Sequence, residues 1–165
     1  MKMKILILAF LLITFLNFNV QAQIEKGSRL VGGAGYVLWK DPFLINLSPN
    51  LGYFLSNRLV LGSSVGLMFY GYEDYSNVSI ALTPFTRYYF GRGGTRLFVL
   101  ASLGYRREWG RSTEGSSVRR SSFGHASGNL GLGLTHLITE QIGLEAILDI
   151  RGINVGFQIY IPSSK

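Results

Sequence analysis

Apolar residues recur at every second position along most of the chain after residue 26. A period of two is typical of β-strands with one apolar face, whereas no stretch after residue 26 sustains the 3.6-residue period of an amphipathic helix. We therefore predict an all-β fold. Eight strands are expected, at residues 28–39, 43–54, 58–70, 77–90, 95–107, 121–136, 142–150 and 153–161.

The predicted connections are of two kinds. Those after the second, fourth and sixth strands are tight and contain turn-forming residues, as in GRGG at 91–94. The third and fifth strands are followed by the longer stretches GYEDYS and GRSTEGSSVRRS, which we expect to be loops, while the first and seventh connections are short. Tight turns at one end and longer loops at the other are typical of outer-membrane barrels.

The polar faces of the strands separate a soluble barrel from a membrane barrel, because the two have opposite polarity. In the predicted fourth strand one face carries Ile80, Leu82 and Phe90, and the other carries Ser79 and Arg87. The polar faces hold small residues and a few charges in place of the lysine and glutamate of a water-facing sheet. We predict an eight-stranded antiparallel up-and-down transmembrane β-barrel with a packed polar interior. The alternative is a soluble ligand-binding barrel.

The first residues have the pattern of a secretory signal peptide. Lys2 and Lys4 precede the apolar stretch Ile5–Phe18, and Ala22 is a suitable cleavage site. An uncleaved anchor is the alternative, but the unbroken apolar part ends at residue 16 and is shorter than the about 20 residues of a spanning helix. We predict a cleaved leader at 1–22 and one outer-membrane barrel domain at 23–165.

Composition narrows the possible partners. The chain has no cysteine, so disulfides do not stabilise it. Its net charge of +7 comes mainly from arginine, and nucleic acid is not an expected partner of an exported chain. We expect a monomer in the cell outer membrane, with outer-membrane lipid, lipopolysaccharide and the barrel assembly machinery as partners.

Several stretches resemble a known family. QIEKGSRLVGGAGY, LSPNLGYFLSNRLVLGSSVGL, LTPFTRYYF, RLFVLASLGY, LGLGLTHLITEQIGLEAIL and INVGFQIYI are similar to the outer-membrane β-barrel domain family, the small porin-like proteins of Gram-negative bacteria. The resemblance implies an eight-stranded barrel in the outer membrane, generally without an assigned biochemical activity. One departure is that such barrels commonly end on an aromatic residue, whereas this chain continues from Tyr160 to Lys165.

Four charged residues are candidates for an interior network. Arg87, Glu145, Asp149 and Arg151 fall on or next to predicted inward faces, and Arg106 lies near the outer rim. Buried charges are tolerated when they are paired and hydrogen-bonded, so opposite signs on different strands predict salt bridges that plug the lumen. A narrow pore is the alternative. Pro84 in the fourth strand predicts a bulge or locally broken pairing.

The fifth connection is rich in arginine and is the candidate surface site. Arg107, Arg111, Arg119 and Arg120 could bind the phosphates of lipopolysaccharide, because guanidinium groups bind phosphate in a bidentate manner. The alternative is a solvated loop that is basic without a ligand.

One short motif raises the question of catalysis. His125 and Ser127 are similar to the His-x-Ser of the outer-membrane lipid A deacylases, in which a glutamate orients the histidine. Glu140 is the acid that follows, but the predicted turn places it about 40 Å from Ser127 along an extended chain. We predict a structural or adhesive protein without catalysis, cofactor or metal site. A lipid A-modifying hydrolase is the alternative.

Overall fold

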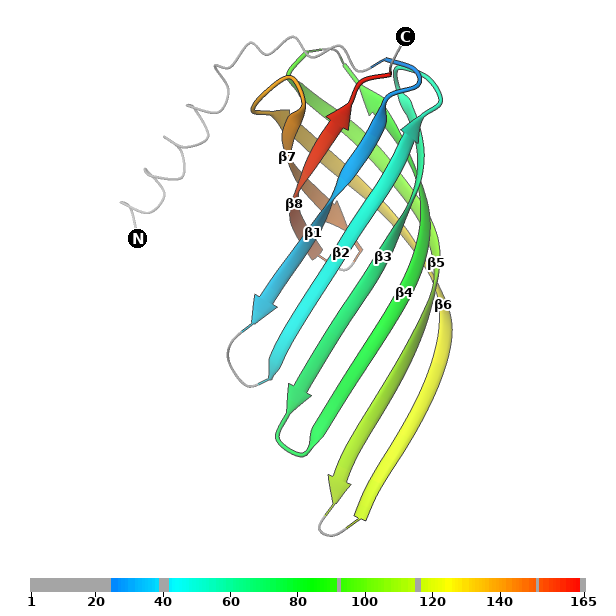
Figure 1. The fold of residues 1–165 in the computed structure, drawn as a ribbon, viewed down its shortest axis with the longest axis vertical. Helices are drawn as coiled ribbons and strands as arrows, with labels where there is room; N and C mark the ends of the chain where they lie inside the picture. Colours follow the sequence, from blue (N-terminus) through cyan, green and yellow to red (C-terminus); the bar gives the residue numbers. More distant parts are fainter. Residues whose placement is uncertain (1–24, 39–41, 92, 115–116, 151, 164–165) are drawn as a thin grey trace, which may run out of the picture.

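A computed structural model describes residues 25–38, 42–91, 93–114, 117–150 and 152–163. Eight strands form a closed barrel in which each strand pairs antiparallel with the next and β8 pairs with β1 (Figure 1). The predicted all-β, up-and-down topology is confirmed, whereas the predicted leader at 1–22 lies outside the described residues. The strands are β1 (Arg29–Leu38), β2 (Phe43–Phe54), β3 (Leu59–Tyr72), β4 (Tyr75–Phe90), β5 (Thr95–Glu114), β6 (Ser117–Leu137), β7 (Ile142–Asp149) and β8 (Gly152–Ile161).

The tight turns and the ends of the described chain lie at the same end of the barrel, at the top of Figure 1. In the turn between β4 and β5, Gly91 and Gly93 have φ angles of 80° and 104°, which glycine adopts without strain. In the turn between β2 and β3, the amide of Leu55 donates to the carbonyl of Leu59 at 2.9 Å. Within the described ranges, no helix is long and apolar enough to cross a bilayer.

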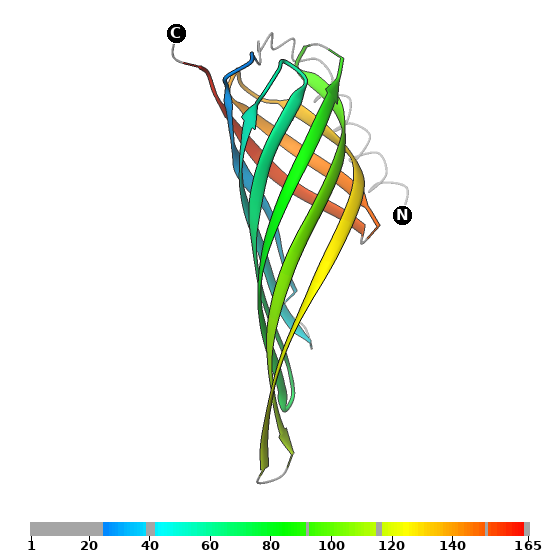
Figure 2. The same ribbon diagram turned by 90° about the vertical axis from the view of Figure 1, so that its right-hand side faces the viewer.

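The two stretches expected to be long loops are largely strand. β3 and β4 continue to a turn at residues 73–74, and β5 and β6 form a hairpin of 20 and 21 residues (Figures 1 and 2). The loop prediction for these stretches is therefore wrong. Residues 118–124 of β6 are exposed on both faces, so the apolar alternation disappears there although backbone pairing continues. We call residues 106–114 and 117–122 of the β5–β6 hairpin the arm.

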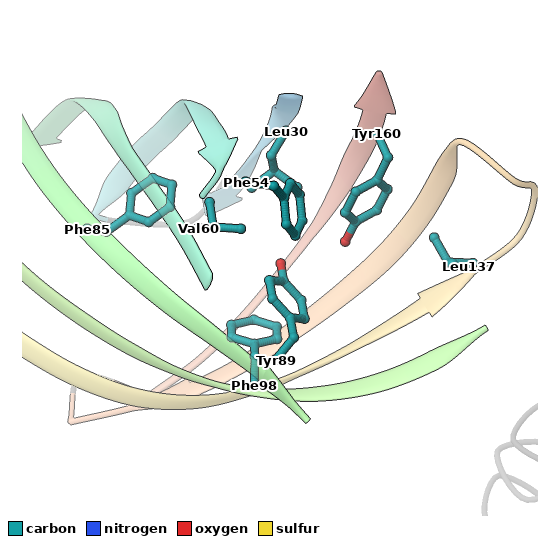
Figure 3. Close-up of a cluster of buried hydrophobic side chains, with 8 residues drawn as sticks. All are labelled: Leu30, Phe54, Val60, Phe85, Tyr89, Phe98, Leu137 and Tyr160. Atoms are coloured by element: carbon teal, nitrogen blue, oxygen red, sulfur yellow. The ribbon is translucent and has the colours of Figure 1, made fainter. Parts of the chain in front are cut away.

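The interior is not polar throughout, and this corrects the prediction of a packed polar lumen. An aromatic cluster fills the end of the barrel that carries the tight turns (Figure 3). Its members lie near the strand ends at that side and are Leu30, Phe54, Val60, Phe85, Tyr89, Phe98, Leu137 and Tyr160. Rings of Phe54 and Tyr89 lie 5.8 Å apart between centroids, and those of Tyr89 and Phe98 lie 5.1 Å apart. Among the described residues, the buried apolar core therefore lies at this end of the barrel.

The outer face is apolar on every strand. Large apolar side chains such as Leu51, Leu82, Leu103 and Phe157 point away from the interior and are exposed. The predicted faces of β4 are confirmed, because Ser79 and Arg87 are buried while Ile80, Leu82 and Phe90 are exposed. A soluble barrel would bury its apolar face, whereas a transmembrane barrel presents that face to lipid.

Pro84 interrupts one backbone ladder. β4 and β5 pair as far as Leu82 and Tyr105, and pairing resumes at Phe85 and Ser102 in an unchanged register. No residue is inserted, so the feature is a locally broken pairing and not a bulge. The cause is that proline has no N–H to donate to the neighbouring strand.

Candidate functional site

Two of the predicted interior charges form a buried ion pair. Arg87 on β4 donates through Nη1 to Oε2 of Glu145 on β7 at 2.8 Å, and both side chains are buried. Thr135 and Gln158 also donate to this carboxylate, at 3.5 and 3.4 Å. The Arg87 guanidinium lies 4.8 Å from the centroid of the Phe85 ring, in cation–π geometry. The pair therefore cross-links opposite walls of the barrel directly above the aromatic cluster.

Asp149 does not join the Arg87 pair. Its Oδ2 accepts hydrogen bonds from Asn129 at 2.7 Å and from Asn154 at 3.4 Å. Arg151, the fourth predicted member, lies outside the described residues. Sequence reasoning had not singled out Asn129, although its inward position on β6 could have indicated it. Within the described residues, the Glu145 and Asp149 carboxylates thus have different hydrogen-bond partners.

A small polar cavity lies beside both groups, with a volume of about 140 Å³. Arg87, Glu145, Asp149 and residues of every strand line it. The amide oxygens Oδ1 of Asn50 and Asn129 are buried and have no hydrogen-bond partner among the described residues. The cavity can therefore receive hydrogen bonds from a donor. On the side of the tight turns it is lined by Phe85 of the aromatic cluster.

The predicted arginines lie on strands of the arm and not in a loop. Arg111 and Arg120 are directly opposite each other across β5 and β6, and therefore share one face. Arg107 is four residues before Arg111 on the same face of β5, and its guanidinium lies 5.7 Å from the Trp109 ring centroid. Arg119 points to the opposite face. The structure therefore places three of the four predicted arginines on one face of the arm, and two of these directly opposite each other.

The two residues of the His-x-Ser motif do not form a catalytic pair. His125 and Ser127 lie on the inward face of β6, but no hydrogen bond joins them or links His125 to a carboxylate in the described part of the chain. The His125 ring stacks on Phe123 at a centroid distance of 5.6 Å. Glu140 lies in the turn at the other end of β6. Within the described ranges, no three acidic or histidine side chains are grouped as metal ligands.

Comparison with known proteins supports the fold. No protein-family model and no curated protein gives a significant match to the chain. The N-terminal β-barrel domain of Pseudomonas aeruginosa OprF is similar in structure, with a TM-score of 0.60 and 23% identity over 82% of this chain and 98% of that domain.

Two further solved structures are similar at lower scores. The attachment invasion locus protein Ail of Yersinia pestis has a TM-score of 0.49 and 18% identity, over 82% of this chain and 95% of Ail. A de novo designed transmembrane β-barrel has a TM-score of 0.47 and 12% identity, over 83% and 98%. On the OprF match, together with the closed eight-stranded topology, the chain has the fold of the small outer-membrane β-barrels.

Proposed function

We propose that the protein is a monomeric outer-membrane barrel with a structural and surface-interaction role, whose arm binds phosphate groups of lipopolysaccharide. The apolar outer face supports insertion into a membrane. On this proposal the chain is exported with a leader at 1–22 and inserted by the barrel assembly machinery. No catalytic step is included, because His125 and Ser127 lack the hydrogen bonds that would activate a serine.

The observation that carries the proposal is the pairing of Arg111 with Arg120. Directly opposite residues in an antiparallel ladder have Cβ atoms about 4.5–5.5 Å apart, and like charges at this distance destabilise the pair. Neither arginine has an ion-pair partner among the described side chains. A bound phosphate would relieve the repulsion, because each guanidinium can donate two hydrogen bonds to it.

The position of the arginines indicates the source of the phosphate. Tyr105 and Trp109 alternate with Arg107 and Arg111 on the outward face of β5, and both rings are exposed. Tyrosine and tryptophan concentrate at the headgroup level of membranes. The arginines therefore begin at the height where phosphorylated glycolipid offers its anionic groups.

The test compares the binding of phosphorylated and dephosphorylated lipid A. We expect Arg111→Gln/Arg120→Gln to lose about tenfold or more of its affinity for phosphorylated lipid A, the order of one or two charge-assisted hydrogen bonds. The matched control is Arg58→Gln/Arg119→Gln, which removes the same charge from a turn and from the other face of the arm. Equal losses in both variants, or equal affinity for the two lipids in the wild type, would contradict the proposal.

Localisation is tested separately by fractionation. The mature chain is expected in the outer-membrane fraction and soluble only with detergent. Recovery from a periplasmic extract without detergent would favour the soluble barrel.

A further inference from the structure

The β7–β8 hairpin is much shorter than the β5–β6 hairpin, so the barrel wall is shorter on that side. β7 has 8 residues, fewer than the about 9–11 of a tilted membrane-spanning strand. Figures 1 and 2 show that this hairpin ends well short of the β5–β6 hairpin along the barrel. Ile150 and Ile153 at its tip are 77% and 75% exposed, more than the other large apolar side chains that are described. An exposed apolar tip is more stable in the hydrocarbon layer of a membrane than in water.

The seam between β1 and β8 is open above this point. The two strands pair from Arg29 and Ile161 to Ala34 and Gly156, and no further. Residues 35–38 continue as strand paired with β2, and residues 152–155 continue as strand paired with β7. Within the described residues, each segment therefore has one edge without a strand neighbour. We call the gap between these two edges the notch.

The notch leads into the polar cavity. The cavity is lined by Ala34 and Gly35 from the β1 side of the seam and by Asn154 from the β8 side. Unpaired backbone groups are costly at the level of the hydrocarbon layer, where no water is present to satisfy them. A group that enters the notch must therefore both donate and accept hydrogen bonds. It must also donate to the buried oxygens of Asn50 and Asn129.

We propose that the notch is a lateral binding site for a membrane amphiphile with a neutral polyol headgroup, whose hydroxyls occupy the cavity while its acyl chain stays in the bilayer. A hydroxyl donates and accepts, so it satisfies both the amide oxygens and the strand edges. A phosphate or carboxylate only accepts, and both guanidinium groups that line the cavity already have a carboxylate nearby, Arg87 at 2.8 Å from Glu145 and Arg106 at 3.9 Å from Glu108. An ammonium group only donates. The cavity volume of about 140 Å³ suits a headgroup of glycerol size.

This inference rests on the proposed insertion in a membrane but not on lipid A binding by the arm. The arm variant Arg111→Gln/Arg120→Gln is therefore expected to leave the amphiphile site unchanged, so that failure of one proposal does not decide the other.

The experiment uses the full mature chain folded in micelles of a detergent without hydroxyl groups. The probe is 1-O-dodecylglycerol with a photoreactive diazirine in its chain, and labelled residues are identified by mass spectrometry. Unlabelled dodecylglycerol and its di-O-methyl ether are compared as competitors at equal mole fraction in the micelle. In the dimethyl ether both hydroxyl protons are replaced by methyl groups, so its oxygens accept hydrogen bonds but do not donate them.

We expect labels on residues 35–38 and 152–155, and dodecylglycerol to compete about tenfold better than the dimethyl ether, as expected for one or two buried acceptors. Asn50→Leu should reduce this preference to less than about threefold. The matched control Asn77→Leu removes an amide that does not line the cavity, and should keep the preference. Labels elsewhere, equal competition in the wild type, or equal behaviour of the two variants would overturn the proposal.

Discussion

The Arg87–Glu145 pair offers the sharpest test of how the barrel interior is stabilised. Either single replacement, Arg87→Met or Glu145→Leu, leaves the other charge buried. In Arg87→Met the carboxylate would keep only the hydrogen bonds from Thr135 and Gln158, which are 3.5 and 3.4 Å long. We expect each single variant to lower the free energy of unfolding by about 3–5 kcal/mol.

The double variant Arg87→Met/Glu145→Leu should be far less destabilised than the sum of the two single variants. It removes both charges and fills their space with apolar side chains. The remaining loss of stability comes from Thr135 and Gln158, whose polar groups lose their hydrogen-bond acceptor. We expect a loss of about 1–3 kcal/mol for the double variant. The resulting coupling energy of about 3 kcal/mol or more would be the signature of a buried pair.

The assay is urea unfolding from micelles, followed by tryptophan fluorescence and analysed by linear extrapolation. The matched control is Arg106→Met with Glu108→Leu, which removes the same residue types from a partly exposed pair whose charged atoms are 3.9 Å apart. That pair should show a coupling energy of about 0–1 kcal/mol. The reasoning would be refuted if each single variant lost less than about 1 kcal/mol of unfolding free energy. It would also be refuted if the losses of the two single variants were additive in the double variant.

Three further changes test the wall and the core. Pro84→Val supplies the missing N–H, and should raise the free energy of unfolding by about 1 kcal/mol and slow hydrogen exchange of the new amide. Gly133→Ala places a methyl group against the Phe98 ring and should cost about 1–3 kcal/mol in urea unfolding, whereas Gly128→Ala meets only ordinary contacts and should cost little. Tyr89→Ala combined with Phe98→Ala removes two rings of the aromatic cluster. The double variant should conduct ions in a planar bilayer while the wild type does not, and equal conductance would show that the cluster does not close the lumen.

The strand faces could be predicted because side-chain direction alternates strictly along a strand. Ser79 and Arg87 were placed inward on β4 from their positions alone, and both are buried. The partner of Arg87 could not be predicted in the same way. β4 and β7 are not neighbours in the barrel, so the choice between Glu145 and Asp149 depends on the stagger of all the strands between them.

The arm shows where the apolar pattern stops being informative. Pairing between β5 and β6 continues to Glu114 and Ser117, through residues that the sequence suggested were a loop. A hydrophobic pattern reports burial of one face, and a sheet that meets solvent on both faces carries no such pattern. The face shared by Arg111 and Arg120 follows from their register, which was not available until the segment was known to be strand.

The apolar alternation that predicted the strands could not have predicted the notch. Residues 35–38 and 152–155 both fall almost entirely within the predicted strands, and both are strands in the structure. The pattern does not show whether two strands are hydrogen-bonded to each other, because side chains alternate in the same way at a paired and at an unpaired edge. Hydrogen bonds close the barrel only where β1 and β8 pair, and within the described residues this pairing ends at Ala34 and Gly156. A short last hairpin in an eight-stranded barrel therefore predicts a lateral opening at membrane height, unless a bound group satisfies the two edges that have no strand neighbour among the described residues.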